Sequence, residues 1–60
     1  MKIISGKLTR LNKTVIKALL SANKQTETFN RTFYHLSEKD GIYTVKIIKN
    51  RVQKDVLFKL

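Results

Sequence analysis

The chain has 60 residues, with thirteen Lys plus Arg against four Asp plus Glu and a net charge of +9 at neutral pH. This length gives a single small basic domain, residues 1–60, and a domain of this size buries only about 60% of the surface that its unfolded chain exposes. The absence of cysteine excludes disulfides, and one histidine without any cysteine excludes an ordinary structural zinc site.

The composition also bounds the class of protein. No apolar run approaches the roughly 20 residues that span a bilayer, and the N-terminus lacks the hydrophobic region of a signal peptide, so a cytoplasmic protein without a membrane span is expected. No glycine-rich phosphate loop, nucleophile elbow, CxxC or HExxH motif occurs, so no cofactor or metal is expected. A chain this small without disulfides often gains stability by oligomerising, which makes a homodimer one expectation.

The charge is unevenly distributed along the chain. Residues 1–26 carry six basic groups and no acid, whereas residues 27–60 carry seven basic groups and all four acids. This asymmetry predicts a polyanionic partner, with nucleic acid (DNA or RNA) favoured over an anionic membrane. The competing interpretation is a lysine-rich surface that only keeps the chain soluble.

In chain order, residues 1–8 predict a short strand that Gly6 bends or interrupts. Residues 10–23 predict an amphipathic helix, with Thr9 or Asn12 as its N-cap and Asn23 as its C-cap. The helical spacing predicts an apolar face of Leu11, Val15, Ala18, Leu19 and Ala22, with Ile16 and Leu20 on a flank nearer the basic stripe.

A connector at residues 25–27 precedes a strand from Thr28 to Leu36, which is rich in threonine and aromatic residues. The Asp40-Gly41 dipeptide predicts a turn of two possible lengths, and these differ by one residue in register. A two-residue turn pairs Tyr34 with Ile47, whereas a turn with a glycine bulge places Phe33 and His35 on that face instead. The sequence leaves both registers open.

Residues 41–48 predict the central strand of an antiparallel meander, and residues 52–60 predict the strand that follows it. With Asn50-Arg51 as a two-residue loop, Val45 lies opposite Val56, Tyr43 opposite Phe58 and Lys46 opposite Asp55, which are favourable cross-strand pairs. The predicted fold is therefore α+β: one amphipathic helix packed on a three-stranded antiparallel meander, with a short N-terminal strand as an option, in the order (β)-α-β-β-β.

Three sets of residues are candidates for binding. The first is a basic face of the helix without an acid among its members, and the second is a cluster of cations around the Asn50-Arg51 turn. The third is the aromatic and basic strand around Phe33, Tyr34 and His35, where one of Phe33 and Tyr34 must point away from the core. The predicted nucleic-acid-binding residues are Arg10, Lys13, Lys17, Lys24, Arg31, Lys46, Lys49, Arg51 and Lys54.

The sequence therefore favours a non-enzymatic nucleic-acid-binding protein that contacts the phosphate backbone, of the kind found as a phage or mobile-element accessory regulator. The alternative is a protein-interaction module or inhibitor that docks on an acidic partner through the sheet, Ile16 and Leu20. A second alternative is a small ribonuclease toxin that uses His35 with Lys46 or Arg31, because His35 is the one side chain suited to proton transfer near neutral pH.

Overall fold

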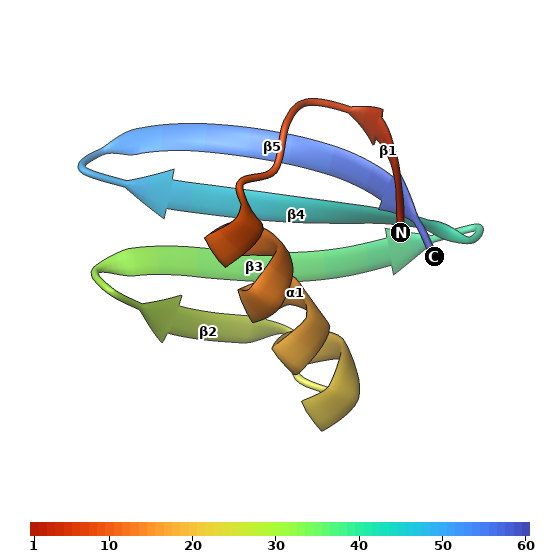
Figure 1. Cartoon of the computed structure of the whole chain (residues 1–60), viewed down its shortest axis with the longest axis horizontal. Coiled ribbons are helices and arrows are strands. Elements are labelled where there is room, and N and C mark those ends of the chain that lie inside the picture. The colour runs from red at the N-terminus through yellow and green to blue at the C-terminus, as the bar shows by residue number, and fades with distance from the viewer.

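The structure, a computed structural model, describes residues 1–60 as one antiparallel sheet with a single helix (Figure 1). The elements are β1 (Lys2–Ser5), α1 (Arg10–Ala22), β2 (Thr26–Phe29), β3 (Thr32–Lys39), β4 (Ile42–Lys49) and β5 (Val52–Lys59). The strand order in the sheet is β1-β5-β4-β3-β2. The predicted three-stranded meander is therefore wrong, because the sheet has five strands.

The main error lies in the predicted strand from Thr28 to Leu36, which a tight turn divides into β2 and β3. Asn30 and Arg31 have φ angles of 52° and 62°, so both lie in the left-handed region that a type I′ turn requires. The chain therefore reverses there, and the predicted connector at Thr26-Glu27 instead forms half of β2.

The N-terminal segment forms a short strand, and β1 pairs with β5 at the edge of the sheet. The register shifts between Ile3 and Ser5, and Gly6 follows with a φ of +89°. A Cβ at position 6 would lie 3.1 Å from both the Asp55 carbonyl oxygen and a Val56 methyl carbon. Position 6 therefore needs glycine for its backbone conformation and for this close approach.

The helix is capped at both ends. At the N-terminus, the Asn12 N–H donates a hydrogen bond of 3.1 Å to the hydroxyl oxygen of Thr9, which is one of the two predicted N-caps. At the C-terminus, Asn23 adopts the left-handed conformation with a φ of 56°, and the Lys24 N–H donates to the Leu19 carbonyl at 3.0 Å. With 13 residues, α1 is shorter than the roughly 20 residues that a membrane-spanning helix needs.

The core lies between α1 and the three middle strands of the sheet. The prediction that Ile16 sits on a flank near the basic stripe is wrong, because its side chain is fully buried. Leu11, Ala18 and Ala22 were predicted on the buried face, and all three are exposed. The helix is rotated so that Ile16, rather than Ala18 and Ala22, packs against the sheet, which buries more apolar area. The core residues are Val15, Ile16, Leu19, Tyr34, Leu36, Val45, Ile47, Val56 and Phe58.

The central strand β4 pairs with β3 and β5 in well-defined registers. In the β3–β4 hairpin, Tyr34 lies opposite Ile47, so the two-residue turn at Asp40-Gly41 is the correct alternative. The register predicted for the β4–β5 hairpin is confirmed, and the rings of Tyr43 and Phe58 stack with their centroids 5.3 Å apart.

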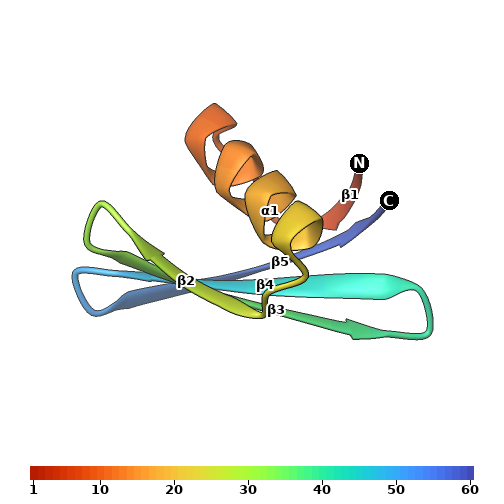
Figure 2. The same ribbon diagram turned by 90° about the horizontal axis from the view of Figure 1, so that it is seen from below.

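Only one face of the sheet is covered. Seen along the sheet, α1 lies entirely on one side, and no element lies on the other (Figure 2). The register places Phe33, His35 and Lys46 on that uncovered side, since they alternate with the buried Tyr34, Leu36 and Val45. We call this side the open face.

Candidate nucleic-acid interface

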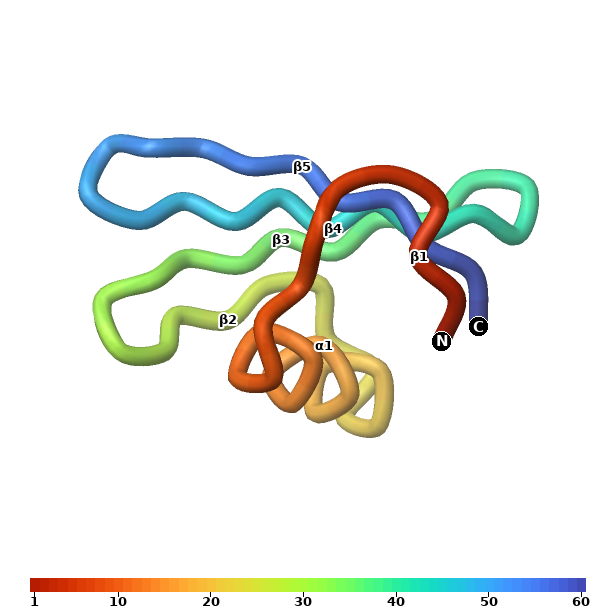
Figure 3. Tube along the Cα trace, turned by 45° about the horizontal axis from the view of Figure 1, so that its top comes forward, coloured from red at the N-terminus to blue at the C-terminus, as the bar shows by residue number.

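Two hairpin turns with the same sequence lie at one end of the sheet. The β2–β3 turn is Asn30-Arg31 and the β4–β5 turn is Asn50-Arg51, whereas the β3–β4 turn and both chain termini lie at the opposite end (Figure 3). Asn50 and Arg51 have φ angles of 51° and 64°, nearly the same as in the first turn. The fold therefore brings two exposed arginines from separate hairpins to the same end.

Two lysines stand beside these turns on the helix side of the sheet. Lys49 ends β4 opposite Val52, and Lys54 lies opposite the core residue Ile47. Both lysines are exposed. We call the end of the sheet that carries these four cations the basic end: Arg31, Lys49, Arg51 and Lys54.

A groove of about 470 Å³ opens between the basic end and the N-terminal end of α1. Its walls carry hydrogen-bonding side chains from the helix end and from both turns, together with Lys49 and Lys54. We call it the tip groove, and its lining residues are Thr9, Leu11, Asn12, Asn30, Thr32, Tyr34, Ile47, Lys49, Asn50, Val52 and Lys54.

The inner wall of the tip groove is held by one hydrogen bond between helix and sheet. The Tyr34 hydroxyl donates to the Asn12 Oδ1 atom at 2.7 Å. Tyr34 is only 1% exposed, and desolvation by this burial raises the pKa of its hydroxyl. The hydroxyl can donate this hydrogen bond only while it is protonated, and the bond ties the N-terminal part of α1 to β3.

No acidic side chain lines the tip groove. Glu38 and Asp40 lie at the β3–β4 turn at the far end, and Asp55 lies on the open face opposite Lys46. Glu27 forms an ion pair of 3.9 Å with Lys24 after the helix C-cap. The positive charge of the basic end is therefore not offset by a neighbouring carboxylate.

The other predicted binding residues lie elsewhere. Arg10, Lys13 and Lys17 are exposed on the side of α1 that faces away from the sheet, as their spacing relative to the buried Val15 and Leu19 requires. Lys24 lies beyond the helix, paired with Glu27 as described. The predicted helix stripe is thus reduced to three residues, and none of them lines the tip groove.

The predicted cation cluster around the Asn50-Arg51 turn is divided between the two faces of the sheet. Lys46 lies on the open face between His35 and Asp55, whereas Lys49 and Lys54 line the tip groove on the helix side. His35 is half-buried and pairs across the sheet with Lys46 and Thr26. Arg31 lies at the basic end and not beside His35 and Lys46.

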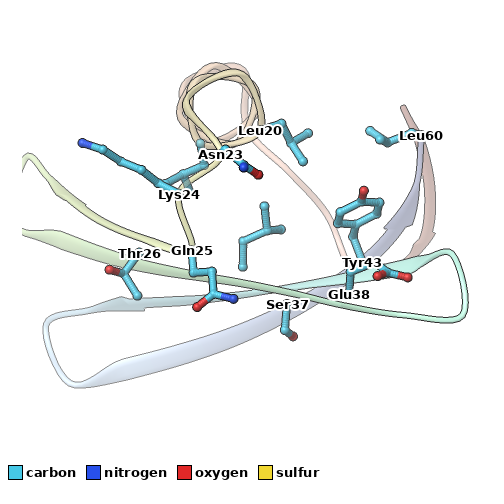
Figure 4. Close-up of a pocket in the computed structure, with 11 residues that line it drawn as sticks. Leu20, Asn23, Lys24, Gln25, Thr26, Ser37, Glu38, Tyr43 and Leu60 are labelled. Atoms are coloured by element: carbon cyan, nitrogen blue, oxygen red, sulfur yellow. The ribbon is translucent and has the colours of Figure 1, made fainter.

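A second, larger groove of about 1050 Å³ lies at the C-terminal end of the helix (Figure 4). Tyr43 extends from β4 into the space between Leu20 and Leu60. Lys24 and Glu38 are also among the lining residues, and the Lys24 side chain extends away from the groove. One cation against one carboxylate makes this groove nearly neutral, in contrast to the tip groove. It therefore suits an apolar or mixed ligand better than a polyanion.

The polar lining of the tip groove does not follow from the sequence pattern. Asn30 belongs to a turn that was not predicted, although the same Asn-Arg dipeptide was recognised as a loop at residues 50 and 51. Comparing these two dipeptides would have revealed the first turn. No local pattern brings Thr9 and Asn12 of the helix end next to the sheet, because that contact depends on the tertiary fold.

No group of three or more His, Cys, Asp and Glu side chains comes together in this fold. Comparison of the chain with protein-family models, with curated proteins and with solved structures gave no significant match.

Proposed function

We propose that this chain is a small non-enzymatic nucleic-acid-binding protein that contacts the phosphate backbone through its basic end. The observation that carries the proposal is the conformation of Arg31 and Arg51, with φ angles of 62° and 64°. A left-handed conformation costs an L-residue with a side chain about 1–2 kcal/mol, and glycine avoids this cost. The β3–β4 turn of the same protein has Gly41 at the corresponding position.

Both turns at the basic end therefore keep an arginine where glycine would be more stable. A local conformational cost of this kind is a reason to look for a function of the side chain. An arginine at the tip of a tight turn projects beyond the sheet, and its planar guanidinium can bind a phosphate through two parallel hydrogen bonds.

The tip groove complements the two arginines. Lys49 and Lys54 add two positive charges, and Asn30, Asn50 and Thr9 add neutral hydrogen-bond donors. Contacts of these types to phosphate and sugar position a protein on nucleic acid without selecting a sequence. We therefore propose binding without base specificity at the basic end, with Arg10, Lys13 and Lys17 as a secondary contact for a long polyanion.

A salt titration with a charge-matched control tests this proposal. In the test variant the four cations of the basic end become glutamine (Arg31→Gln, Lys49→Gln, Arg51→Gln, Lys54→Gln). The control variant carries Lys2→Gln, Lys7→Gln, Lys39→Gln and Lys59→Gln. Each variant loses four positive charges, which takes the net charge from +9 to +5. Binding to mixed-sequence duplex DNA, which hides its bases, is measured from low to physiological salt.

If the basic end holds the phosphates, the log–log salt slope on duplex DNA should become shallower by about 3.6 in the test variant, because each lost phosphate contact is worth about 0.9. The slope of the control variant should stay close to that of the parent chain. Absence of binding by the parent at physiological salt, or equal losses in both variants, would contradict the proposal, since equal losses would mean that only total charge matters.

A protein-interaction module remains the second candidate, and the second groove supports it. Leu60 is 70% exposed beside Leu20 and Tyr43, which is an arrangement suited to an apolar side chain of a partner. Ile16, predicted to take part in such a contact, is buried and unavailable. Capture of a partner that Leu20→Asp abolishes, while nucleic-acid affinity is unchanged, would favour this candidate.

We also propose a cytoplasmic setting and self-association into a homodimer. The support for the dimer is β2, an edge strand whose free side carries no neighbour and whose Phe29 is 49% exposed. Light scattering over a range of concentrations measures the mass, and a strictly monomeric mass would disprove the dimer.

A further inference from the structure

The open face carries an exposed aromatic ring in the body of the sheet. Phe33 is 39% exposed, although β3 is flanked by β2 on one side and β4 on the other. Its cross-strand neighbours on the same face are Thr28 and Ile48. Because the adjacent Tyr34 fills the core on the opposite side, the core does not account for the ring of Phe33.

A second flat ring lies next to Phe33 on the same face. His35 is two residues further along β3, so the two rings project from the same side at a spacing of about 7 Å. His35 is half-buried between Thr26 and Lys46, which lie opposite it on the flanking strands. Phe33 and His35 thus form a short row of rings with a cation beside it.

The charge of the open face is also positive. Its strand positions carry Lys2, Lys39, Lys46 and Lys59 against a single acid, Asp55. The Asp55 Oδ1 atom accepts a hydrogen bond of 3.3 Å from the Gln53 amide. A ligand of this face must therefore be able to bind next to positively charged side chains, which favours a ligand with negative charge.

We propose that the open face binds the unpaired bases of single-stranded nucleic acid, with one base stacked on Phe33 and its neighbour on His35 while Lys46 contacts the phosphate. Sheets with exposed rings bind single strands in this way because every base has a flat face, and a duplex hides those faces. This proposal rests on the proposed function, because Arg31 of the basic end lies only two residues before Phe33. A strand that crosses the turn can continue directly onto the rings.

A second copy of the chain is the main rival occupant, since Ile48 and Leu57 are also partly exposed on this face. Two open faces packed together would lie about 10 Å apart and would bring their lysines into opposition without enough carboxylates to pair them. Thr26, Thr28, Ser37 and Thr44 also make this face more polar than the core of a homodimer interface.

The test uses the full chain and three matched probes: a twelve-nucleotide single strand as DNA, the same sequence as RNA, and the corresponding DNA duplex, all at one salt concentration. Phe33→Leu removes the ring and keeps an apolar side chain. The expected result is a loss of about 5- to 150-fold in affinity for the single strand, in the DNA arm or the RNA arm, with unchanged affinity for the duplex.

Phe33→Trp keeps a ring and introduces the only tryptophan of the chain. Its fluorescence should be quenched by a single strand and not by the duplex, and its affinity should match that of the parent. The proposal would be overturned if the Phe33→Leu variant bound both single strands with the affinity of the parent. It would also be overturned if neither single strand changed the tryptophan fluorescence of the Phe33→Trp variant. A dimer that Phe33→Leu converts to a monomer, with nucleic-acid affinity unchanged, would overturn it in favour of a second copy.

The outcomes also separate this inference from the proposed function. If glutamine at the basic end abolishes binding and Phe33→Leu has no effect, only the inference fails. If the parent binds neither duplex nor single strand at physiological salt, both fail.

Discussion

The two ends of the sheet use the same kind of turn with different residues. All three turns have two successive residues at positive φ, as the right-handed twist of a hairpin favours. The β3–β4 turn uses Asp40-Gly41, and the Gly41 N–H donates a 2.8 Å hydrogen bond to a Glu38 carboxylate oxygen. The two turns at the basic end use Asn-Arg, and neither contains glycine.

In the Asp40-Gly41 turn, a glycine adopts positive φ without strain. In the two Asn-Arg turns, an arginine occupies the same position at a conformational cost. At Asp40-Gly41, the glycine removes the cost of positive φ and a nearby carboxylate adds a hydrogen bond, so each choice favours stability. At Asn30-Arg31 and Asn50-Arg51, the second position carries a cation at a conformational cost. The contrast supports the proposal that nucleic acid binds at the basic end, whereas the Asp40-Gly41 turn needs only a structural explanation.

The largest effect is expected from replacing both turn arginines by glycine. Arg31→Gly with Arg51→Gly relieves two left-handed side chains, so the free energy of unfolding should rise by about 1–2 kcal/mol in total, after allowance for the greater freedom of glycine in the unfolded chain. The salt slope on duplex DNA should become shallower by about 1.8, because two phosphate contacts are lost. Urea unfolding and the salt titration measure the two effects on the same variant.

Gly41→Arg is the matched control at the structural end. Its Cβ would meet no atom within 4 Å, so the change introduces positive-φ strain without a clash, and stability should fall. If the Arg31→Gly, Arg51→Gly variant is instead less stable than the parent, positive φ does not destabilise the two arginine turns. The two ends of the sheet would then not differ in conformational cost.

Much of the sheet was accessible from the sequence because its turns are local. Asn50-Arg51 fixed the register of the β4–β5 hairpin, and Asp40-Gly41 limited the β3–β4 hairpin to two registers. The turn at Asn30-Arg31 was not predicted because it lies inside a run of threonine and aromatic residues, and such a run predicts one continuous strand. That single omission accounts for the missing strand β2.

The site was less accessible because it combines distant parts of the chain. All four cations of the basic end are among the binding residues predicted from the sequence. The same prediction grouped Lys46 with Lys49 and Lys54, whereas strand alternation places Lys46 on the opposite face. It also predicted the helix face from spacing alone. Ile16 is buried in place of Ala18 and Ala22 because of the shape of the sheet beneath the helix. The helical spacing of apolar residues does not predict that shape.

A smaller effect is expected at Tyr34, the tyrosine of the tip groove. Tyr34→Phe removes the hydrogen bond to Asn12, so the free energy of unfolding should fall by about 1 kcal/mol at pH 7. Because burial raises the pKa of Tyr34, the unfolded chain loses this proton first as the pH rises above about 10. The unfolded state then binds fewer protons than the folded state, so the stability that Tyr34 contributes is present below pH 10 and is lost as the pH rises through the raised pKa.

Urea unfolding at several pH values between 7 and 11 measures this dependence. The parent should lose stability above about pH 10 more steeply than Tyr34→Phe. Tyr43→Phe at the other end of the sheet is the control, since no hydrogen bond of the Tyr43 hydroxyl forms in this fold and its side chain is only partly buried. Equal alkaline slopes for the parent and Tyr34→Phe would show that the Tyr34 hydroxyl is not held protonated in the tip groove.

The smallest effect is expected at Glu38, which supports the structural turn. Glu38→Ala leaves the Gly41 N–H without its side-chain acceptor, but this N–H is exposed and water can replace the carboxylate, so the loss should be about 0.5 kcal/mol. Glu38→Gln keeps an acceptor oxygen and should lose less, which separates the hydrogen bond from the charge. Both variants remove a negative charge from the far end, and duplex affinity should stay close to that of the parent if binding depends on the basic end. A gain in affinity as large as the loss caused by Arg31→Gly with Arg51→Gly would instead mean that the two ends act only through total charge.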